Sequence, residues 1–189
     1  SSSGTNKTTF AAQAQSADIA YVLPASQGSA NSVLTNDGSG NLSWGTGGVL
    51  FAKKSSDQSI SATATDDANF TFSLAANKTY EIRGILKVYT SSTSGAIRCQ
   101  FVAPTGTTQF VTSFANRSAQ DDVVYCTSAN TYYDLSPSNS MSNTSDVMMI
   151  EGTITTGSTA GTYKITWQCN SGKTGTVYTG SYMKITLVQ

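Results

Sequence analysis

The sequence contains no histidine, and charged residues make up only 12% of its 189 residues. Without histidine, the chain lacks the usual base of Ser-His and Cys-His catalysis and the commonest zinc ligand. The charged fraction is far below the roughly 25% that is typical of globular proteins. Eleven Lys and Arg balance eleven Asp and Glu, and no segment concentrates basic side chains. We therefore expect neither a nucleic-acid partner nor an anionic membrane partner, because both require a basic surface.

Long hydrophobic runs are also missing. No stretch approaches the ~20 consecutive apolar residues of a transmembrane helix. The opening segment, SSSGTNKTTF, does not have the charged and then apolar layout of a secretion signal. These two absences predict a soluble protein that is not addressed to a membrane.

Cysteine occurs three times, an odd and scattered number that cannot form a closed disulfide framework. Each cysteine shares a strand-like alternation with apolar neighbours: Cys99 with Ile97 and Phe101, Cys126 with Val124, and Cys169 with Ile165 and Trp167. Free cysteine is among the residues most often buried in proteins. We therefore expect three small core side chains, in a chain that assembles in a reducing cytosol.

The apolar residues from Phe51 onward recur with the two-residue period of β-strands. Clusters of Gly, Pro, Asn, Asp and Ser interrupt them about every ten residues, as is typical of an all-β sandwich or barrel. The clearest strands are TYEIRGILKVYT, with Tyr80, Ile82, Leu86 and Val88 on one face, GTYKITWQC, with Tyr163, Ile165, Trp167 and Cys169, and SYMKITLVQ, with Met183, Ile185 and Leu187. Further strand candidates are VLFAKK, NFTFSLA, AIRCQFVAP, TTQFVTSFA, DVVYCTS and DVMMIEGTITT. We expect the last strand to be buried, because an exposed apolar edge invites aggregation.

The region before residue 49 has a different character. TNKTTFAAQAQSADIAYVLPAS is rich in Ala, Gln and Ser, and its apolar residues are too few to enclose a core. Behind it, VLTNDGSGNLSWG places the turn formers of residues 36–40 between two strand-like segments, which predicts a small β-hairpin. The chain is therefore divided into an extended N-terminal attachment arm with a hairpin, residues 1–48, and a β-sandwich body, residues 49–189.

The apolar residues of this arm are candidates for docking or for pairing between copies. An isolated hairpin is marginally stable in water, so the arm requires another surface to pack against. Three chains that pair their arms about a common axis would meet that need. The candidate residues are Phe10, Ile19, Tyr21, Leu23, Val33, Leu34, Leu42 and Trp44.

Two segments carry a resemblance to phage virion appendage proteins. LPASQGSANSVLTNDGSGNLSWG resembles a tail-fibre repeat in which a Leu-Pro, a Gly, a Val-Leu-Thr, an Asp-Gly and a final Leu-Ser-Trp recur. FTFSLAANKTYEIRGILKVYTSSTSGAIRCQFVAP is similar to the terminal jelly-roll knobs of such proteins. The resemblance covers residues 19–104 and implies a jelly-roll-like knob that forms a homotrimer on the virion surface. A single copy of the repeat favours a short capsid-decorating (cement) knob or a head fibre over a tail fibre with a long shaft.

The resemblance implies a partner on the particle, either the major capsid protein or a tail component. An alternative function is a tail-fibre tip that binds a host-surface glycan or protein. Its contact loop would be TSANTYYDLSPSNSMSNTSD, because Tyr132 and Tyr133 offer amphipathic surface among small polar residues. Ordinary strand or subunit packing is the competing explanation for both tyrosines. A third class, a secreted carbohydrate-binding module or TNF-like ligand, would require a secretion signal.

The remaining acidic residues do not predict an enzyme. Asp66–Asp67 and Asp121–Asp122 are adjacent pairs in loop-like settings, and neighbouring residues of an extended chain point to opposite sides. Neither pair therefore forms a glycosidase acid/base pair, and we expect both to lie in solvated loops.

The hairpin segment also imitates the start of a calcium-binding loop, with Asp37, Ser39 and Asn41 at the spacing of its first ligands. The pattern then fails, because Leu42 stands where the turn glycine belongs and Gly48 where the bidentate Glu belongs. The sequence predicts neither a metal site nor a cofactor.

Overall fold

The structure is a computed structural model, and it describes residues 14–29, 32–45, 47–90, 97–116, 122–134 and 146–188. The regular elements in these ranges are all β-strands. Within the same ranges, no helix is long and apolar enough to cross a membrane. The chain divides into two compact units, Ser1–Gly47 and Gly48–Gln189. The boundary expected from the sequence lay one residue later.

In the first unit, the turn-rich segment forms the predicted β-hairpin. Strand β1 (Val33–Asn36) pairs antiparallel with strand β2 (Leu42–Gly45). The preceding chain lies alongside, because Val22 N donates to Gly40 O at 2.9 Å and Val22 O accepts from Leu42 N at 2.8 Å. The hairpin prediction is confirmed. The two backbone hydrogen bonds that join the segment around Val22 to the hairpin were not predicted from the sequence.

The second unit contains strands β3 to β14. Their bounds are β3 (Val49–Lys53), β4 (Gln58–Ile60), β5 (Thr65–Leu74), β6 (Thr79–Thr90), β7 (Ile97–Val102), β8 (Thr108–Asn116), β9 (Asp122–Cys126), β10 (Tyr132–Asp134), β11 (Asp146–Thr155), β12 (Gly161–Cys169), β13 (Gly175–Val177) and β14 (Tyr182–Leu187). The strands expected from the alternation are present. The short strands β4, β10 and β13 were not predicted, because three residues cannot display a period of two.

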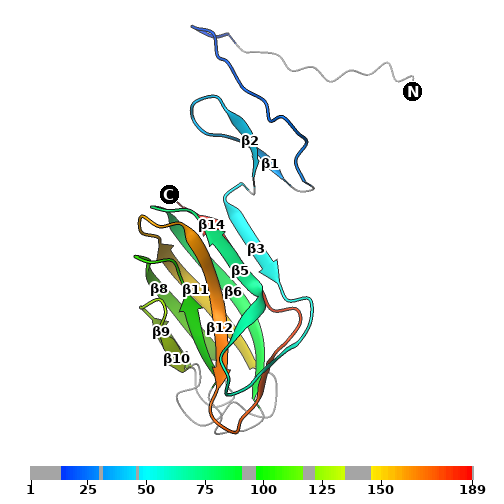
Figure 1. Ribbon diagram of the computed structural model, residues 1–189, viewed down its shortest axis with the longest axis vertical. Helices are drawn as coiled ribbons and strands as arrows, with labels where there is room; N and C mark the ends of the chain where they lie inside the picture. The colour runs from blue at the N-terminus through cyan, green and yellow to red at the C-terminus, as the bar shows by residue number, and fades with distance from the viewer. Residues whose placement is uncertain are drawn as a thin grey trace, which may run out of the picture. The chain divides into compact units, whose positions relative to one another are not determined.

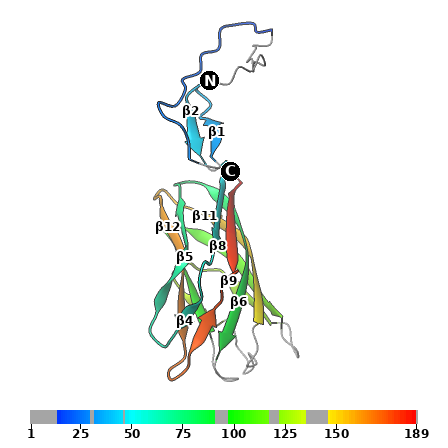
Figure 2. The same ribbon diagram turned by 90° about the vertical axis from the view of Figure 1, so that its right-hand side faces the viewer.

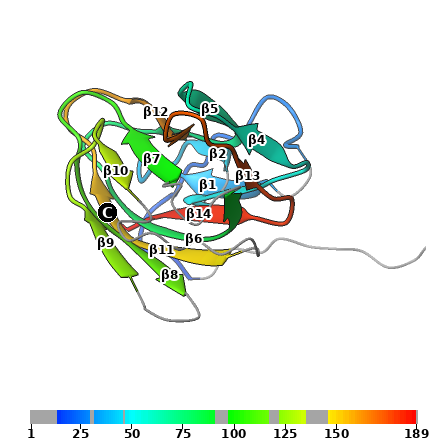
Figure 3. The same cartoon turned by 90° about the horizontal axis from the view of Figure 1, so that it is seen from below.

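These strands form two sheets that pack face to face (Figure 1, Figure 3). The smaller sheet has the order β10-β7-β12-β5. The larger sheet has the order β3-β14-β6-β11-β8-β9, with β13 beside β6 and β4 beside β13. The pairings within both sheets are antiparallel. The predicted all-β sandwich is confirmed.

The core lies between the two sheets, and the alternation of each strand determines which side chains enter it. In β6, Arg83 and Lys87 are exposed, whereas the four predicted core residues are buried: Tyr80, Ile82, Leu86 and Val88. In β12, the four predicted core residues are buried as well: Tyr163, Ile165, Trp167 and Cys169. All three cysteines are free and buried, as predicted. Every buried hydrophobic residue in the described part of the chain lies between Ile60 and Ile185, and therefore in the second unit.

The last strand, β14, lies inside the larger sheet between β3 and β6 (Figure 2). Met183 and Ile185 are fully buried, which confirms that this strand is not an exposed edge. Leu187 was expected on the same buried face but is 39% exposed. It is the last residue of β14, and the buried part of the strand ends two residues earlier.

Candidate functional site

The turn of the N-terminal hairpin is held by the side chains of Asn36 and Asp37. Asn36 Oδ1 accepts from Gly38 N at 2.8 Å, and Asp37 Oδ1 accepts from Ser39 N at 2.7 Å. Asn41 donates twice to Asp37, from its side-chain amide at 2.7 Å and from its backbone N–H at 3.1 Å. The bond from the Asn41 amide and then that from Ser39 lower the pKa of the Asp37 carboxyl below its usual value. The oxygens that imitate a calcium ligand are therefore engaged within the turn.

The indole of Trp44 is fixed against the segment that precedes the hairpin. Its Nε1 donates to Ser26 O at 2.8 Å. Its ring lies so close to Gly28 that a Cβ at this position would be 2.6 Å from Trp44 Cδ2. Only glycine fits such a contact, yet the tryptophan remains 42% exposed. Trp44 is therefore held in one orientation with part of its ring free to contact a partner.

The predicted docking residues of the arm are mostly exposed. Leu42 is half-buried, and Phe10 lies outside the described residues. Six others are exposed and form what we call the arm surface: Ile19, Tyr21, Leu23, Val33, Leu34 and Trp44. The hairpin unit therefore presents large apolar side chains to its surroundings instead of folding around them.

The two tyrosines of the expected contact loop have different surroundings. Both lie in β10, which pairs with β7. Tyr133 packs against the core, and its hydroxyl accepts from Ser128 N at 2.7 Å and donates to Ser128 O at 3.1 Å. Tyr132 is 36% exposed. Of the two, Tyr132 is the more exposed; the loop that follows, residues 135–145, lies outside the described residues.

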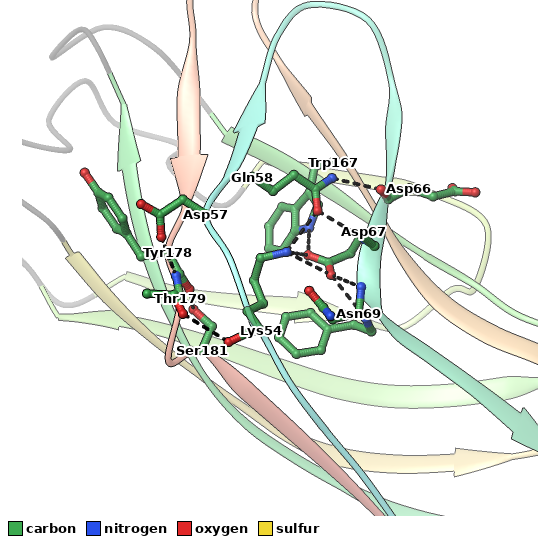
Figure 4. Close-up of polar contacts among 12 residues, drawn as sticks. Lys54, Asp57, Gln58, Asp66, Asp67, Asn69, Trp167, Tyr178, Thr179 and Ser181 are labelled. Atoms are coloured by element: carbon green, nitrogen blue, oxygen red, sulfur yellow. Dashed lines mark hydrogen bonds and ion pairs between the residues drawn. The ribbon is translucent and has the colours of Figure 1, made fainter.

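A fully buried ion pair joins the two sheets (Figure 4). Lys54, which follows β3 of the larger sheet, places Nζ 3.0 Å from Oδ2 of Asp67 in β5 of the smaller sheet. Trp167 Nε1 donates to the same Oδ2 at 2.8 Å, and Gln58 Oε1 accepts from Lys54 Nζ at 2.9 Å. The Lys54 Nζ also lies 5.6 Å from the centre of the Phe70 ring. Because its polar groups are bonded to one another, this cluster is a structural link between the sheets.

The location of Asp66–Asp67 corrects the sequence analysis, which placed both residues in a solvated loop. Both lie in β5, where alternation exposes Asp66 and buries Asp67. Asp66 forms hydrogen bonds with Lys164 and Thr166, and these bonds, Lys164 first, lower the pKa of its carboxyl. The expectation that adjacent acids point to opposite sides is met. The side chains of Asp121–Asp122 lie outside the described part of the chain.

The buried thiols are not arranged as nucleophiles. Burial raises the pKa of Cys169 to about 11. The pKa of Cys99 is raised well above its usual value by a hydrogen bond with Cys126 and then by burial. A thiol reacts as its thiolate, so these shifts keep both groups in the unreactive protonated form. Within the described ranges, no three Cys, Asp or Glu side chains gather where they could hold a metal ion.

Sequence reasoning missed an exposed apolar surface on β8, β9 and β11. We call it the outer patch, and its six side chains are 38–58% exposed: Phe110, Phe114, Val123, Tyr125, Val147 and Met149. A signal was present, because the VMMI segment of β11 is apolar in both phases of the strand alternation. A strand with one face in water alternates instead between apolar and polar residues.

In the described part of the chain, the arm surface and the outer patch are exposed apolar features from which a function can be argued. Neither a protein-family model nor a curated protein matches this chain.

Proposed function

We propose that this protein is a structural component of a phage virion, a homotrimeric surface knob held to the particle through its N-terminal arm. It decorates or cements the capsid or forms a head fibre, and its partner is the major capsid protein or a tail component. The observation that carries this proposal is the arm surface, six exposed apolar side chains on a small hairpin unit.

The arm surface has the properties of a docking segment. Burying an exposed Leu, Ile or Val side chain contributes about 1.5–3 kcal/mol, so several half-exposed residues together supply a useful binding energy. Trp44 is already held by Ser26 and Gly28, so binding costs little side-chain entropy at this position. An aromatic residue fixed in this way is suited to act as an anchor in an interface.

The composition of the core supports a knob that folds on its own. The buried hydrophobic residues of the described chain all belong to the second unit, and the first unit contributes none. A body of roughly 140 residues can bury about two-thirds of its unfolded surface, which suffices for an independent domain. The arm is therefore free to serve attachment.

The strand order supports the jelly-roll assignment. The chain repeatedly crosses between the sheets, so that β3-β14-β6-β11 of the larger sheet faces β5-β12-β7-β10 of the smaller. This interleaving is the one expected of the double Greek key in an eight-stranded jelly roll, which is why we propose that fold. The pair β8–β9 is then an addition at the β11 side of the larger sheet.

The environment of Asp66 and Asp67 favours a binding role over catalysis. Asp67 is enclosed with Lys54, and Asp66 is bonded to Lys164 and Thr166. A glycosidase needs two carboxyl groups that flank a substrate bond across about 5–9.5 Å, and these adjacent acids point to opposite faces of one strand. We infer that the protein is not an enzyme and needs no cofactor.

The alternative function, a tail-fibre tip that recognises a host-surface glycan or protein, is favoured by the exposure of Tyr132. It has less support, because Tyr133 is engaged with the core and with Ser128. Attachment to the particle through the arm is common to both functions.

Paired alanine variants test the proposal against the alternative. Trp44→Ala should weaken binding of the purified protein to particles that lack it by at least about tenfold, since an interface aromatic contributes roughly 2 kcal/mol. Tyr132→Ala should leave particle binding unchanged. Both proteins are then tested for adsorption to host cells. Loss of host adsorption by Tyr132→Ala would favour the receptor-binding tip. Unchanged particle binding by Trp44→Ala would count against attachment through the arm, which both functions share. Imaging of the native particle gives the location and the number of copies.

A further inference from the structure

The two sheets of the sandwich present outer faces of opposite character. The smaller sheet presents mainly polar side chains, among them Thr71, Ser73, Lys164 and Gln168. The larger sheet presents the outer patch. Side chains that face water along a strand are normally polar, and strands covered on both sides are apolar throughout. The outer face of the larger sheet therefore has the composition of a surface that another protein covers.

The register of the strands shows that this apolar surface is continuous. Val123 of β9 lies opposite Phe114 of β8, and Phe114 lies opposite Met149 of β11. Met149 lies opposite Ile85 of β6, and Ile85 lies opposite Tyr182 of β14. One row of apolar side chains therefore crosses five neighbouring strands. No stretch of sequence reveals this row, because its members come from five separate segments.

An aromatic pair lies near each end of this face, and Tyr125 and Phe51 are the two ends of the row beside the apolar one. At the β9 end, the rings of Tyr125 and Phe110 lie 6.1 Å apart, and Tyr125 is 58% exposed. At the β3 end, the rings of Phe51 and Tyr182 lie 6.0 Å apart, and Phe51 is 61% exposed. The strands β9 and β3 are separated by five strand spacings of ~4.8 Å, or about 24 Å along the sheet. The face thus carries two different aromatic ends that are too far apart to form one compact pocket.

We propose that this outer face is the surface through which copies of this chain associate, with the Tyr125 end of one copy packed on the Phe51 end of the next. The inference rests on the homotrimer of the proposed function and names the surface that forms it. A closed ring of three identical chains requires a head-to-tail contact between two different surfaces of each chain. The two aromatic ends supply two such surfaces on the same sheet.

The exposed area fits a second copy of the chain as the occupant. Nine side chains, four of them aromatic and each roughly half exposed, give a total on the order of 800 Å² for the outer patch together with Val49, Phe51 and Leu187. In a head-to-tail ring each junction uses one end of the face from each chain, so each partner contributes about half of this apolar area, roughly 400 Å². A stable interface buries about 800 Å² per partner, of which a little over half is apolar. An isolated apolar patch on a monomer is usually smaller, about 300–600 Å². The face is therefore large enough to support a stable association.

The charges near the row are compatible with contact between identical chains. The neighbouring row carries both signs, with Glu151 of β11 opposite Arg83 of β6, and Arg83 opposite Lys184 of β14. Glu81 is bonded to Arg83 at 2.8 Å. The whole chain has equal numbers of acidic and basic residues, so two copies do not repel each other through net charge. These charges lie between the Tyr125 and Phe51 ends of that row, beside the apolar row.

Sedimentation of the full chain with two interface variants and one matched control tests this inference. Tyr125→Lys alters the β9 end and Phe51→Lys alters the β3 end. The matched control is Tyr132→Lys, which also replaces an exposed tyrosine with lysine but lies on the smaller sheet. All three side chains are at least 36% exposed, so the substitutions leave the core intact, and circular dichroism checks the fold. We expect the wild type and Tyr132→Lys to sediment as trimers at micromolar concentration. Each interface variant should dissociate at least about 100-fold more readily.

Mixing the two interface variants tests the head-to-tail arrangement. Each mixed pair retains one intact junction, between the Tyr125 end of the Phe51→Lys chain and the Phe51 end of the Tyr125→Lys chain. The mixture should therefore form dimers but no closed ring. Dissociation by Tyr125→Lys alone would overturn this arrangement, because it would show a contact that does not use the Phe51 end.

The remaining outcomes separate this inference from the proposed function. Trimers that persist in both interface variants would overturn the inference and leave the trimeric knob standing. A wild type that remains monomeric up to about 100 μM would associate more weakly than standard protein interfaces do. That result would overturn both the inference and the trimer. Attachment to the particle is judged independently by the binding of Trp44→Ala.

Discussion

Lys54 and Asp67 form an ion pair across the sandwich with both side chains completely excluded from solvent. The two residues come from different sheets, so the pair fixes the β3 side of the larger sheet against β5 of the smaller. Moving two charges out of water costs several kcal/mol, which only close contact and additional hydrogen bonds can offset. Trp167, Gln58 and the backbone N–H groups of residues 69 and 70 supply these bonds.

We predict that removing either partner of this pair strongly destabilises the knob. Lys54→Met or Asp67→Ala leaves an uncompensated buried charge, which costs about 3–5 kcal/mol of unfolding free energy. Denaturant unfolding followed by circular dichroism measures the change. Asp66→Ala is the matched control, because the neighbouring acid is half exposed and its ion pair with Lys164 is worth at most about 1 kcal/mol. Equal losses for Asp66→Ala and Asp67→Ala would contradict the assignment of a buried charge.

The sequence was sufficient to predict the strands of the sandwich but not its buried charges. The alternation in β6 and β12 identified their core residues correctly, because burial on one face leaves a period of two. Lys54 and Asp67 were not recognised, because each stands beside a residue of the same charge and nothing local shows which of the two is buried. That choice depends on the packing of one sheet against the other.

Only part of the candidate site was predicted from the sequence. The turn formers of residues 36–40 predicted the hairpin, since they favour tight turns wherever they occur. The contact of Trp44 with Gly28 was not predicted, because it depends on how a segment 16 positions earlier folds back onto the hairpin. The row from Val123 to Tyr182 was missed for the same reason: cross-strand neighbours are set by register, which a single sequence does not display.

The buried thiols predict a loss of stability in alkaline solution. The pKa of Cys169 rises from 9.0 to about 11 on folding, so the unfolded chain releases its thiol proton at lower pH than the folded chain does. The stabilising effect of this group is complete below pH 9 and is lost as the pH rises towards 11. Unfolding free energy measured between pH 7 and pH 11 should fall over this window. Cys169→Ala should show a shallower fall, whereas an identical pH profile would count against the burial of this thiol.

We predict that Gly28→Ala releases the indole of Trp44. A methyl group at Gly28 would lie 2.6 Å from the ring, so the tryptophan must move and its bond to Ser26 O is broken or weakened. Acrylamide quenching of tryptophan fluorescence should increase, because the released Trp44 ring is more accessible. The change reports on Trp44, since Trp167 is fully buried and is quenched little. The control is Ser29→Ala at an exposed position of the same segment. Unchanged quenching in Gly28→Ala would mean that the ring is not held against this glycine.

Removal of the hairpin unit should leave a folded knob that no longer attaches to particles. The deletion should end at Gly47, because Gly48 O accepts from Leu187 N at 2.6 Å and belongs to the body. The buried hydrophobic residues of the described chain begin at Ile60, so the deletion removes none of them. We expect the circular dichroism spectrum to remain that of a β-protein, with a melting temperature within about 5 °C of the full chain, a shift of roughly 1 kcal/mol. Trp44→Ala in the full chain should likewise weaken particle binding without lowering the melting temperature of the knob. If the shortened chain is unfolded, or if Trp44→Ala destabilises the knob as much as a core cavity does, by about 3–5 kcal/mol, then the hairpin is part of the body and not an attachment arm.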